Sequence, residues 1–168
     1  MKKRIFTSIF FASLLTLILT FASVSAILYN NAATSIKREV RNESIYISEA
    51  IKSYNENIID ISSYLNSAGA KSLNRITLIS SDGTVTYDNF AQIQTMDNHS
   101  DRPEFIDAMK TGQGEITRFS DTLGESTYYY ALKLNNNDVL RIASTTKSIL
   151  GIVTESIVWF ILIFIFII

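Results

Sequence analysis

The chain has 168 residues, enough for one globular domain, and 47% of them are hydrophobic. Its formal net charge of -1 argues against a nucleic-acid-binding protein, which would carry a basic patch. The chain has no cysteine, which excludes disulfides, thiolate metal sites and a cysteine nucleophile. A single histidine, His99, argues against a histidine-based metal site and a serine–histidine–aspartate triad.

An uncharged apolar run occupies residues 5–28, directly after the basic start Met1-Lys2-Lys3-Arg4. As a helix, this run is about 36 Å long, enough to cross a hydrocarbon core of about 30 Å. We expect a transmembrane helix over 5–28, with a cytoplasmic N-terminus because the cations precede it. The small residues Val24-Ser25-Ala26 leave a second interpretation open, a signal peptide that is cleaved at this point.

A second apolar run occupies residues 149–168 and is interrupted by Glu155. We expect a second transmembrane helix here, with Glu155 at the outer membrane surface because a charge is costly at the bilayer centre. The run from Ser156 onward would be only about 20 Å long as a helix, which indicates a truncated sequence whose continuation enters the cytoplasm. A core helix of a soluble protein is the disfavoured alternative, because apolar residues cover every helical face. The chain would then be a multi-pass plasma-membrane protein.

Residues 29–148 would form one extracytoplasmic domain that opens with a long helix. Its apolar residues recur at steps of three and four. They are Ile47, Ile51, Tyr54, Ile58, Ile61 and Leu65, extended backward by Ile36 and Val40. This seam packs either on the chain's own sheet or, near the membrane, on a second copy of the chain. Gly69 is the predicted helix stop.

The pattern after residue 74 changes to that of strands. We predict strands over 75–80, 84–88, 115–120, 126–134 and 139–143, with a tight turn at Asp82-Gly83. A short helix should begin at Pro103, with Ser100 or Asp101 as its cap, and end at Gly112. A five-stranded antiparallel sheet behind a long N-terminal helix makes an α+β fold.

Candidate binding residues gather around the start of the short helix. His99 and Arg102 lie beside a helix N-terminus, whose free N–H groups favour an anion or a carboxylate. The alternative is a structural role, in which Arg102 pairs with Asp101, Asp97 or Glu104. Tyr128 and Tyr130 could line a ligand cavity on one sheet face, opposite Tyr129, or belong to the core or the surface.

Charged residues on the strands and at the hairpin give weaker signals. Three cations could form a basic patch, although cross-strand pairs with Glu115, Glu125 or Asp138 are the favoured explanation. These cations are Arg118, Lys133 and Arg141. Asp82 and Asp88 lack the spacing of a calcium loop, so we propose no metal there. No nucleophile–base pair or paired carboxylates stand out, and we assign no catalytic residue and no cofactor to this chain.

The hairpin 75–88 resembles the first hairpin of PDC (PAS-like) sensor domains. The segment His99-Ser100-Asp101-Arg102-Pro103-Glu104-Phe105 is similar to the H-x-x-R-P-E segment of PhoR-like sensor histidine kinases. Residues 114–120 and 122–124 look like the next strand pair of that family. The order of anchor, domain and anchor matches as well, so the resemblance covers nearly the whole chain.

The resemblance implies the input region of a bacterial two-component sensor histidine kinase. Such a kinase would be a homodimer in the membrane, respond to a small-molecule or protein signal, and act on a response regulator. ATP and the phosphoaccepting histidine would belong to a cytoplasmic part. Other outputs stay open, namely a chemoreceptor, a diguanylate cyclase or a phosphatase, and so does a secreted or membrane-anchored binding protein.

Overall fold

A computed structural model describes residues 2–56, 61–120, 125–145 and 157–162. The chain divides into two compact units, which are described separately below. One unit comprises residues 1–34 and 147–168, and the other comprises residues 35–146.

The first unit holds the apolar start of helix α1 (Lys2–Glu56). In the part of the chain that the structure describes, one helix, Lys3–Ser53, is long and apolar enough to cross a membrane. Several of its hydroxyl groups donate back to the preceding turn, as Thr16 Oγ1 does to the Ala12 carbonyl at 2.8 Å, so these groups need no water as a partner. The predicted helix over 5–28 is therefore confirmed as a helix, and its place in a membrane stays a prediction.

The second apolar run is described only over residues 157–162, which are helical. Within this unit the Phe160 ring lies edge-on to the Phe21 ring of α1, with the two centroids 4.6 Å apart. The rest of the predicted second transmembrane helix, including Glu155, lies outside the described residues.

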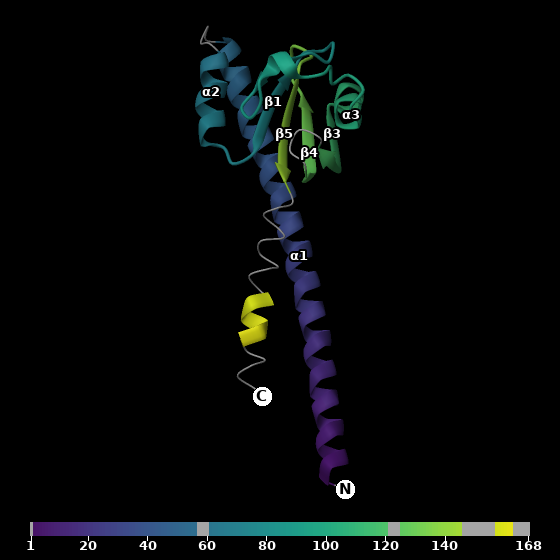
Figure 1. The fold of residues 1–168 in the computed structure, drawn as a ribbon. Coiled ribbons are helices and arrows are strands. Elements are labelled where there is room, and N and C mark those ends of the chain that lie inside the picture. The colour runs from purple at the N-terminus through teal and green to yellow at the C-terminus, as the bar shows by residue number, and fades with distance from the viewer. Residues whose placement is uncertain (1, 57–60, 121–124, 146–156, 163–168) are drawn as a thin grey trace. The chain divides into compact units, whose positions relative to one another are not determined.

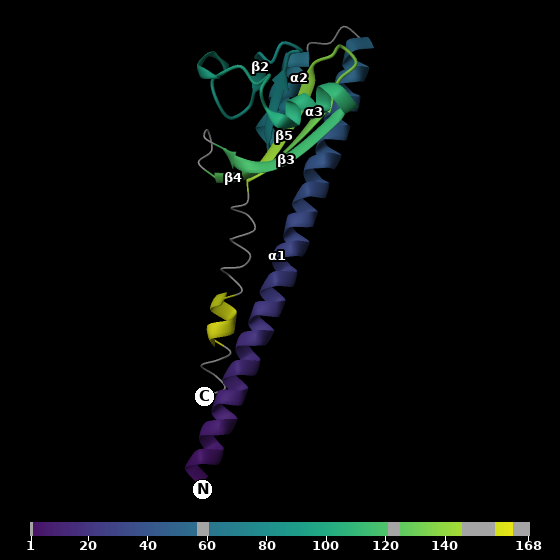
Figure 2. The same cartoon turned by 90° about the vertical axis from the view of Figure 1, so that its right-hand side faces the viewer.

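The second unit is an α+β domain built on one antiparallel sheet of order β2-β1-β5-β4-β3, which confirms the predicted fold class. Its helices lie on the two sides of the sheet (Figures 1 and 2). The strands are β1 (Arg75–Ile79), β2 (Val85–Asp88), β3 (Gln113–Ser120), β4 (Glu125–Lys133) and β5 (Val139–Thr145). The helices are the end of α1, α2 (Ile61–Lys71), the short η1 (Ile93–Thr95) and α3 (Pro103–Thr111).

One face of the sheet packs on α1 and α2. The buried residues of this core are Val40, Ile47, Ile51, Leu65, Ile76, Tyr128, Tyr130, Leu140 and Ile142. Four residues of the predicted seam are thus buried against the chain's own sheet, which supports that interpretation of the seam for this domain. Residue 58 and the side chain of residue 54 lie outside the described part.

The opposite face packs on α3 through Ile79, Val85, Phe105, Ala108, Ala131 and Val139. Pro103 begins α3 as predicted, but the expected cap is wrong. The cap is Arg102, whose carbonyl accepts hydrogen bonds from the N–H groups of Phe105 and Ile106, both at 3.0 Å. Proline at the first helical position makes the residue directly before it the cap, and here no side chain caps the helix.

Gly69 does not end its helix, because α2 continues to Lys71. The glycine serves close packing instead. A Cβ atom at this position would collide with the Tyr87 hydroxyl, which approaches to donate a hydrogen bond to the Leu65 carbonyl at 2.7 Å.

Two glycines with positive φ allow a matched test of the turn geometry. Gly83 (φ 87°) and Gly112 (φ 92°) both occupy the left-handed region, where an L side chain costs about 1–2 kcal/mol. A Cβ at Gly83 would also meet the Ser100 backbone nitrogen at 2.5 Å, whereas a Cβ at Gly112 meets nothing within 4 Å. We expect Gly83→Ala to lower the free energy of unfolding clearly more than Gly112→Ala in urea titrations. Equal losses would show that the segment around Ser100 can move away from the turn.

Candidate anion-binding site

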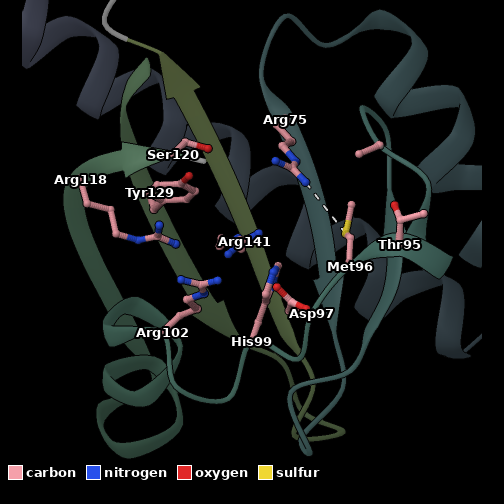
Figure 3. Close-up of a pocket in the computed structure, with 11 residues that line it drawn as sticks. Arg75, Thr95, Met96, Asp97, His99, Arg102, Arg118, Ser120, Tyr129 and Arg141 are labelled. Atoms are coloured by element: carbon pink, nitrogen blue, oxygen red, sulfur yellow. Dashed lines mark hydrogen bonds between the residues drawn. The ribbon is translucent and has the colours of Figure 1, made fainter. Parts of the chain in front are cut away.

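A cavity of about 160 Å³ opens on the sheet face that carries α3. Four arginines line it, two from the middle of the sheet, one from its edge strand and one from the start of α3 (Figure 3). They are Arg75 of β1, Arg141 of β5, Arg118 of β3 and Arg102. The described segment between β2 and α3 contributes Met96, Asp97 and His99 to the lining.

Strand alternation brings the sheet arginines to one face. Ile76 of β1 and Ile142 of β5 pair in register and belong to the core under α1. Their neighbours Arg75 and Arg141 therefore point to the opposite side, as does Tyr129 between Tyr128 and Tyr130 on β4. The apolar pattern that builds the core thus also fixes where the charges lie.

Glu104 organises two of these arginines. It is the second residue of α3 and is fully buried. Its Oε1 atom lies 3.2 Å from Arg118 Nη2 and 3.2 Å from Arg141 Nη1. The Glu104 carboxylate is therefore shared by two guanidinium groups, of which Arg141 is only 3% exposed.

Arg75 is neutralised more completely. Its Nε atom lies 2.8 Å from Asp88 Oδ2, and both side chains are buried. The second oxygen of Asp88 accepts the backbone N–H groups of Phe90 and Ala91, each at 2.9 Å. This pair fixes the start of the segment that closes one side of the cavity.

Tyr129 forms the aromatic part of the lining. The Arg118 guanidinium carbon lies 4.4 Å from the ring centroid and that of Arg141 lies 5.1 Å from it. Cation–π contacts of this kind hold both guanidinium groups over the ring without neutralising their charge. Burial lowers the pKa of Arg141, but guanidinium titrates so far above neutral pH that the group stays charged.

His99 is held rigidly among these charges. Its backbone N–H donates to the Gly83 carbonyl at 2.8 Å, and its own carbonyl accepts the Arg102 N–H at 3.1 Å. Burial, followed by repulsion from Arg141, Arg102 and Arg75, lowers the pKa of His99 to about 4, which outweighs the attraction of Glu104. The imidazole is therefore neutral at pH 7.

Several buried polar atoms of the site have no hydrogen-bond partner among the described residues; one is an acceptor, Glu104 Oε2, and donors outnumber it. The buried Nε atoms of Arg102, Arg118 and Arg141 have no hydrogen-bond acceptor among the described residues. Arg102 Nε does form an ion pair with Asp101 Oδ1 at 3.5 Å, as the structural interpretation of Arg102 predicted. That carboxylate is 76% exposed, and the contact is too long for a hydrogen bond. Buried donors without acceptors are costly, so the arrangement favours a ligand rich in oxygen.

The four candidate residues predicted from the sequence lie on two different faces of the sheet. His99 and Arg102 both line the cavity. Tyr128 and Tyr130 point to the other face, where their hydroxyls donate to Glu115 Oε2 and to Gln113 Oε1. The two tyrosines are thus core residues of the α1 side and do not line this cavity. The ligand-binding role of His99 and Arg102 stays a prediction.

Sequence reasoning missed Arg75, preferred Tyr128 and Tyr130 to Tyr129, and assigned to Arg118 and Arg141 other partners than the structure gives them. Both of these arginines pair with Glu104 of α3, 14 and 37 residues away in sequence, rather than with residues on neighbouring strands. The alternation of Tyr128 and Tyr130 against Tyr129 was the sequence signal that could have shown that Tyr129 faces the other side of the sheet. No sequence signal indicated the pairing of the arginines with Glu104, because that pairing depends on how α3 packs on the sheet.

A family model described as Single Cache-like matches residues 29–140, which is more than half of the chain. The chain belongs to the single Cache-like family. Single Cache-like domains are extracellular sensor domains with a PAS-like fold. The match includes the five strands up to Leu140, α3 and all residues that line the cavity except Arg141.

The other comparisons add little. The crystal structure of the extracellular domain of rpHK1S-Z16, described as a histidine kinase, is 22% identical, with a TM-score of 0.43. The likeness covers 53% of this chain and 39% of that one, so the present chain spans well under half of that structure. No curated protein matches the chain.

The shared carboxylate of this Cache-like domain gives a direct stability test. Glu104→Ala should lower the free energy of unfolding by about 3–5 kcal/mol, because Arg141 is left as an uncompensated buried charge. The matched control is Asp101→Ala, which removes a 76%-exposed ion-pair partner of Arg102 and should cost about 1 kcal/mol or less. Urea titrations followed by tyrosine near-ultraviolet circular dichroism compare the two. Equal losses would show that Glu104 does not hold the arginines together.

Proposed function

We propose that this chain is the extracytoplasmic input module of a two-component sensor histidine kinase, and that its signal is a small anion bound in the arginine cavity. The family membership supports a sensor. The observation that carries the ligand class is the cluster of three buried guanidinium Nε atoms without an acceptor among the described residues, all facing one cavity.

The charge of the lining and the volume of the cavity limit the class of ligand. The four arginines are offset inside the domain by two buried carboxylates, Asp88 and Glu104, while Asp97 and Asp101 lie at the exposed rim. A positive excess remains, which favours an anion with one or two charges. The volume of about 160 Å³ is below the roughly 300–1,000 Å³ of clefts for drug-sized ligands. A short-chain carboxylate, a sulfate or a phosphate fits these limits.

The output side of the proposal rests on the sequence resemblance. A PhoR-like kinase is the finer prediction, together with homodimerisation, a response-regulator partner and ATP bound by a cytoplasmic part. A ligand can switch such a receptor only if it binds two conformations with different affinity. We propose that the shift passes through the segment 149–168 into the cytoplasm.

A panel of anions tests the input role. The chain in lipid nanodiscs is heated with acetate, malate, sulfate or phosphate, and with neutral glycerol as a control. At about 100 times its dissociation constant, the correct anion should stabilise the domain by about 2.7 kcal/mol, which raises the melting temperature by roughly 5–10 °C.

Two variants test whether the anion binds in the arginine cavity. Arg102→Gln should weaken binding about 10- to 100-fold, because one charge-assisted hydrogen bond is lost while the buried ion pairs stay intact. Arg38→Gln on the exposed face of α1 is the matched control and should bind like the parent chain. Stabilisation by no anion, or by anions equally in both variants, would contradict the proposed site.

The signalling role has its own test. The chain is fused through residue 168 to the cytoplasmic half of a characterised sensor kinase with a transcriptional reporter. The stabilising anion should change reporter output in the parent fusion and lose its effect in the Arg102→Gln fusion. A reporter that ignores an anion shown to bind would contradict the kinase-input role while leaving the binding site in place.

A further inference from the structure

The only histidine of the chain, His99, lines the proposed anion cavity. His99 is 9% exposed, and its Nδ1 atom is buried without a hydrogen-bond partner among the described residues. In Figure 3 its ring projects into the cavity beside Arg141 and Asp97. Its backbone bonds to Gly83 and Arg102 hold it there.

We propose that His99 is an anion-contacting residue that takes up one proton from solvent when the anion binds, so that the sensor responds to the anion and to acidity together. This inference rests on the proposed function, because it concerns the same cavity.

The surroundings of His99 explain why the anion-free site keeps the ring neutral. Guanidinium groups face it from three elements: Arg75 from β1, Arg141 from β5 and Arg102 from the start of α3. Arg118 of β3 and Tyr129 of β4 line the same cavity. The acidic groups are Glu104, which is shared by two arginines, Asp97 on the rim, and Asp88 behind Arg75. Positive charge prevails, so a further cation is disfavoured.

A bound anion reverses this balance. Its charge offsets the arginines, and one of its oxygens can accept a hydrogen bond from Nδ1–H, which is stronger when the ring is an imidazolium than when it is neutral. Both effects favour the imidazolium and raise the pKa of His99 above the anion-free value of about 4. Between the two pKa values the complex holds one proton more than its separate components, taken from the buffer onto the imidazole nitrogen.

The sign of the pH dependence follows by linkage. Above the pKa of the complex, the affinity is independent of pH, because His99 is neutral with and without the anion. As the pH falls from that value toward about 4, binding tightens by up to tenfold per pH unit. The arginines themselves contribute no pH dependence in this range.

Sulfate is the probe, because it does not titrate between pH 5 and 8, unlike phosphate. The whole chain, without a polyhistidine tag, is labelled with ¹³C-histidine and reconstituted in lipid nanodiscs. Since the sequence holds one histidine, a single ring signal reports on His99. Its titration midpoint should rise by about two pH units from the anion-free value of about 4 at saturating sulfate. Sulfate should then bind about tenfold more tightly at pH 5 than at pH 7.5.

Calorimetry in buffers of different ionisation enthalpy counts the protons. His99→Asn keeps a side-chain donor near the position of Nδ1 but cannot titrate. It should bind sulfate with no proton uptake and with little pH dependence between pH 5.5 and 7.5. Circular dichroism and the melting temperature of this variant establish that it is folded.

The outcomes separate the two claims. Sulfate binding with an unchanged histidine midpoint, or with proton uptake that persists in His99→Asn, would overturn the role of His99 and leave the anion site standing. Failure of sulfate and of the other anions of the panel to bind at any pH from 5 to 8 would overturn both claims.

Discussion

The cavity face of the sheet, the face that carries α3, depends on one buried carboxylate. Glu104 has no exposed surface and must be compensated, and its partners are Arg118 and Arg141 from two different strands. One carboxylate cannot neutralise two guanidinium groups, so a positive excess is built into the middle of the sheet. The packing of α3, through Phe105 and Ala108, brings this carboxylate to the sheet. The same helix start presents Arg102 and, three residues earlier, His99 to the cavity.

The two faces of the sheet differ in chemistry. The face under α1 is apolar, and its polar groups are satisfied locally, as the Tyr130 hydroxyl is by Gln113. The other face keeps three guanidinium Nε atoms without acceptors among the described residues. Strand β4 carries both, because Tyr129 contacts the cavity arginines while Tyr128 bonds to Glu115, which pairs with Arg41 of α1. A shift of β4 on ligand binding would therefore reach the helix directly.

Local patterns in the sequence were enough to predict the fold, because each depends on neighbours along the chain. Strand alternation predicted the strands of the sheet, Asp82-Gly83 predicted the turn of the first hairpin, and Pro103 predicted the start of α3. The site was less predictable. The predicted helix start at Pro103 identified His99 and Arg102 as candidates. Arg75 was not predicted, because its partner Asp88 lies 13 residues away in sequence. The α3 cap was mispredicted because Pro103 at the first helical position makes Arg102 the cap. The choice of Tyr128 and Tyr130 over Tyr129 has a different origin. Which face of the sheet is apolar is decided by the packing of α1, and the sequence alone does not give it.

The central claim is that the guanidinium Nε groups of the cavity are the anion receptors. Nitrogen-15 spectra of the arginine Nε–H groups, recorded on the whole chain with and without sulfate, test it most directly. The signals of Arg102, Arg118 and Arg141, assigned by single substitutions, should shift and exchange more slowly with solvent when sulfate binds, because each gains an acceptor. The Arg38 signal should not change. Shifts spread evenly over all arginines, or confined to exposed ones, would contradict the account.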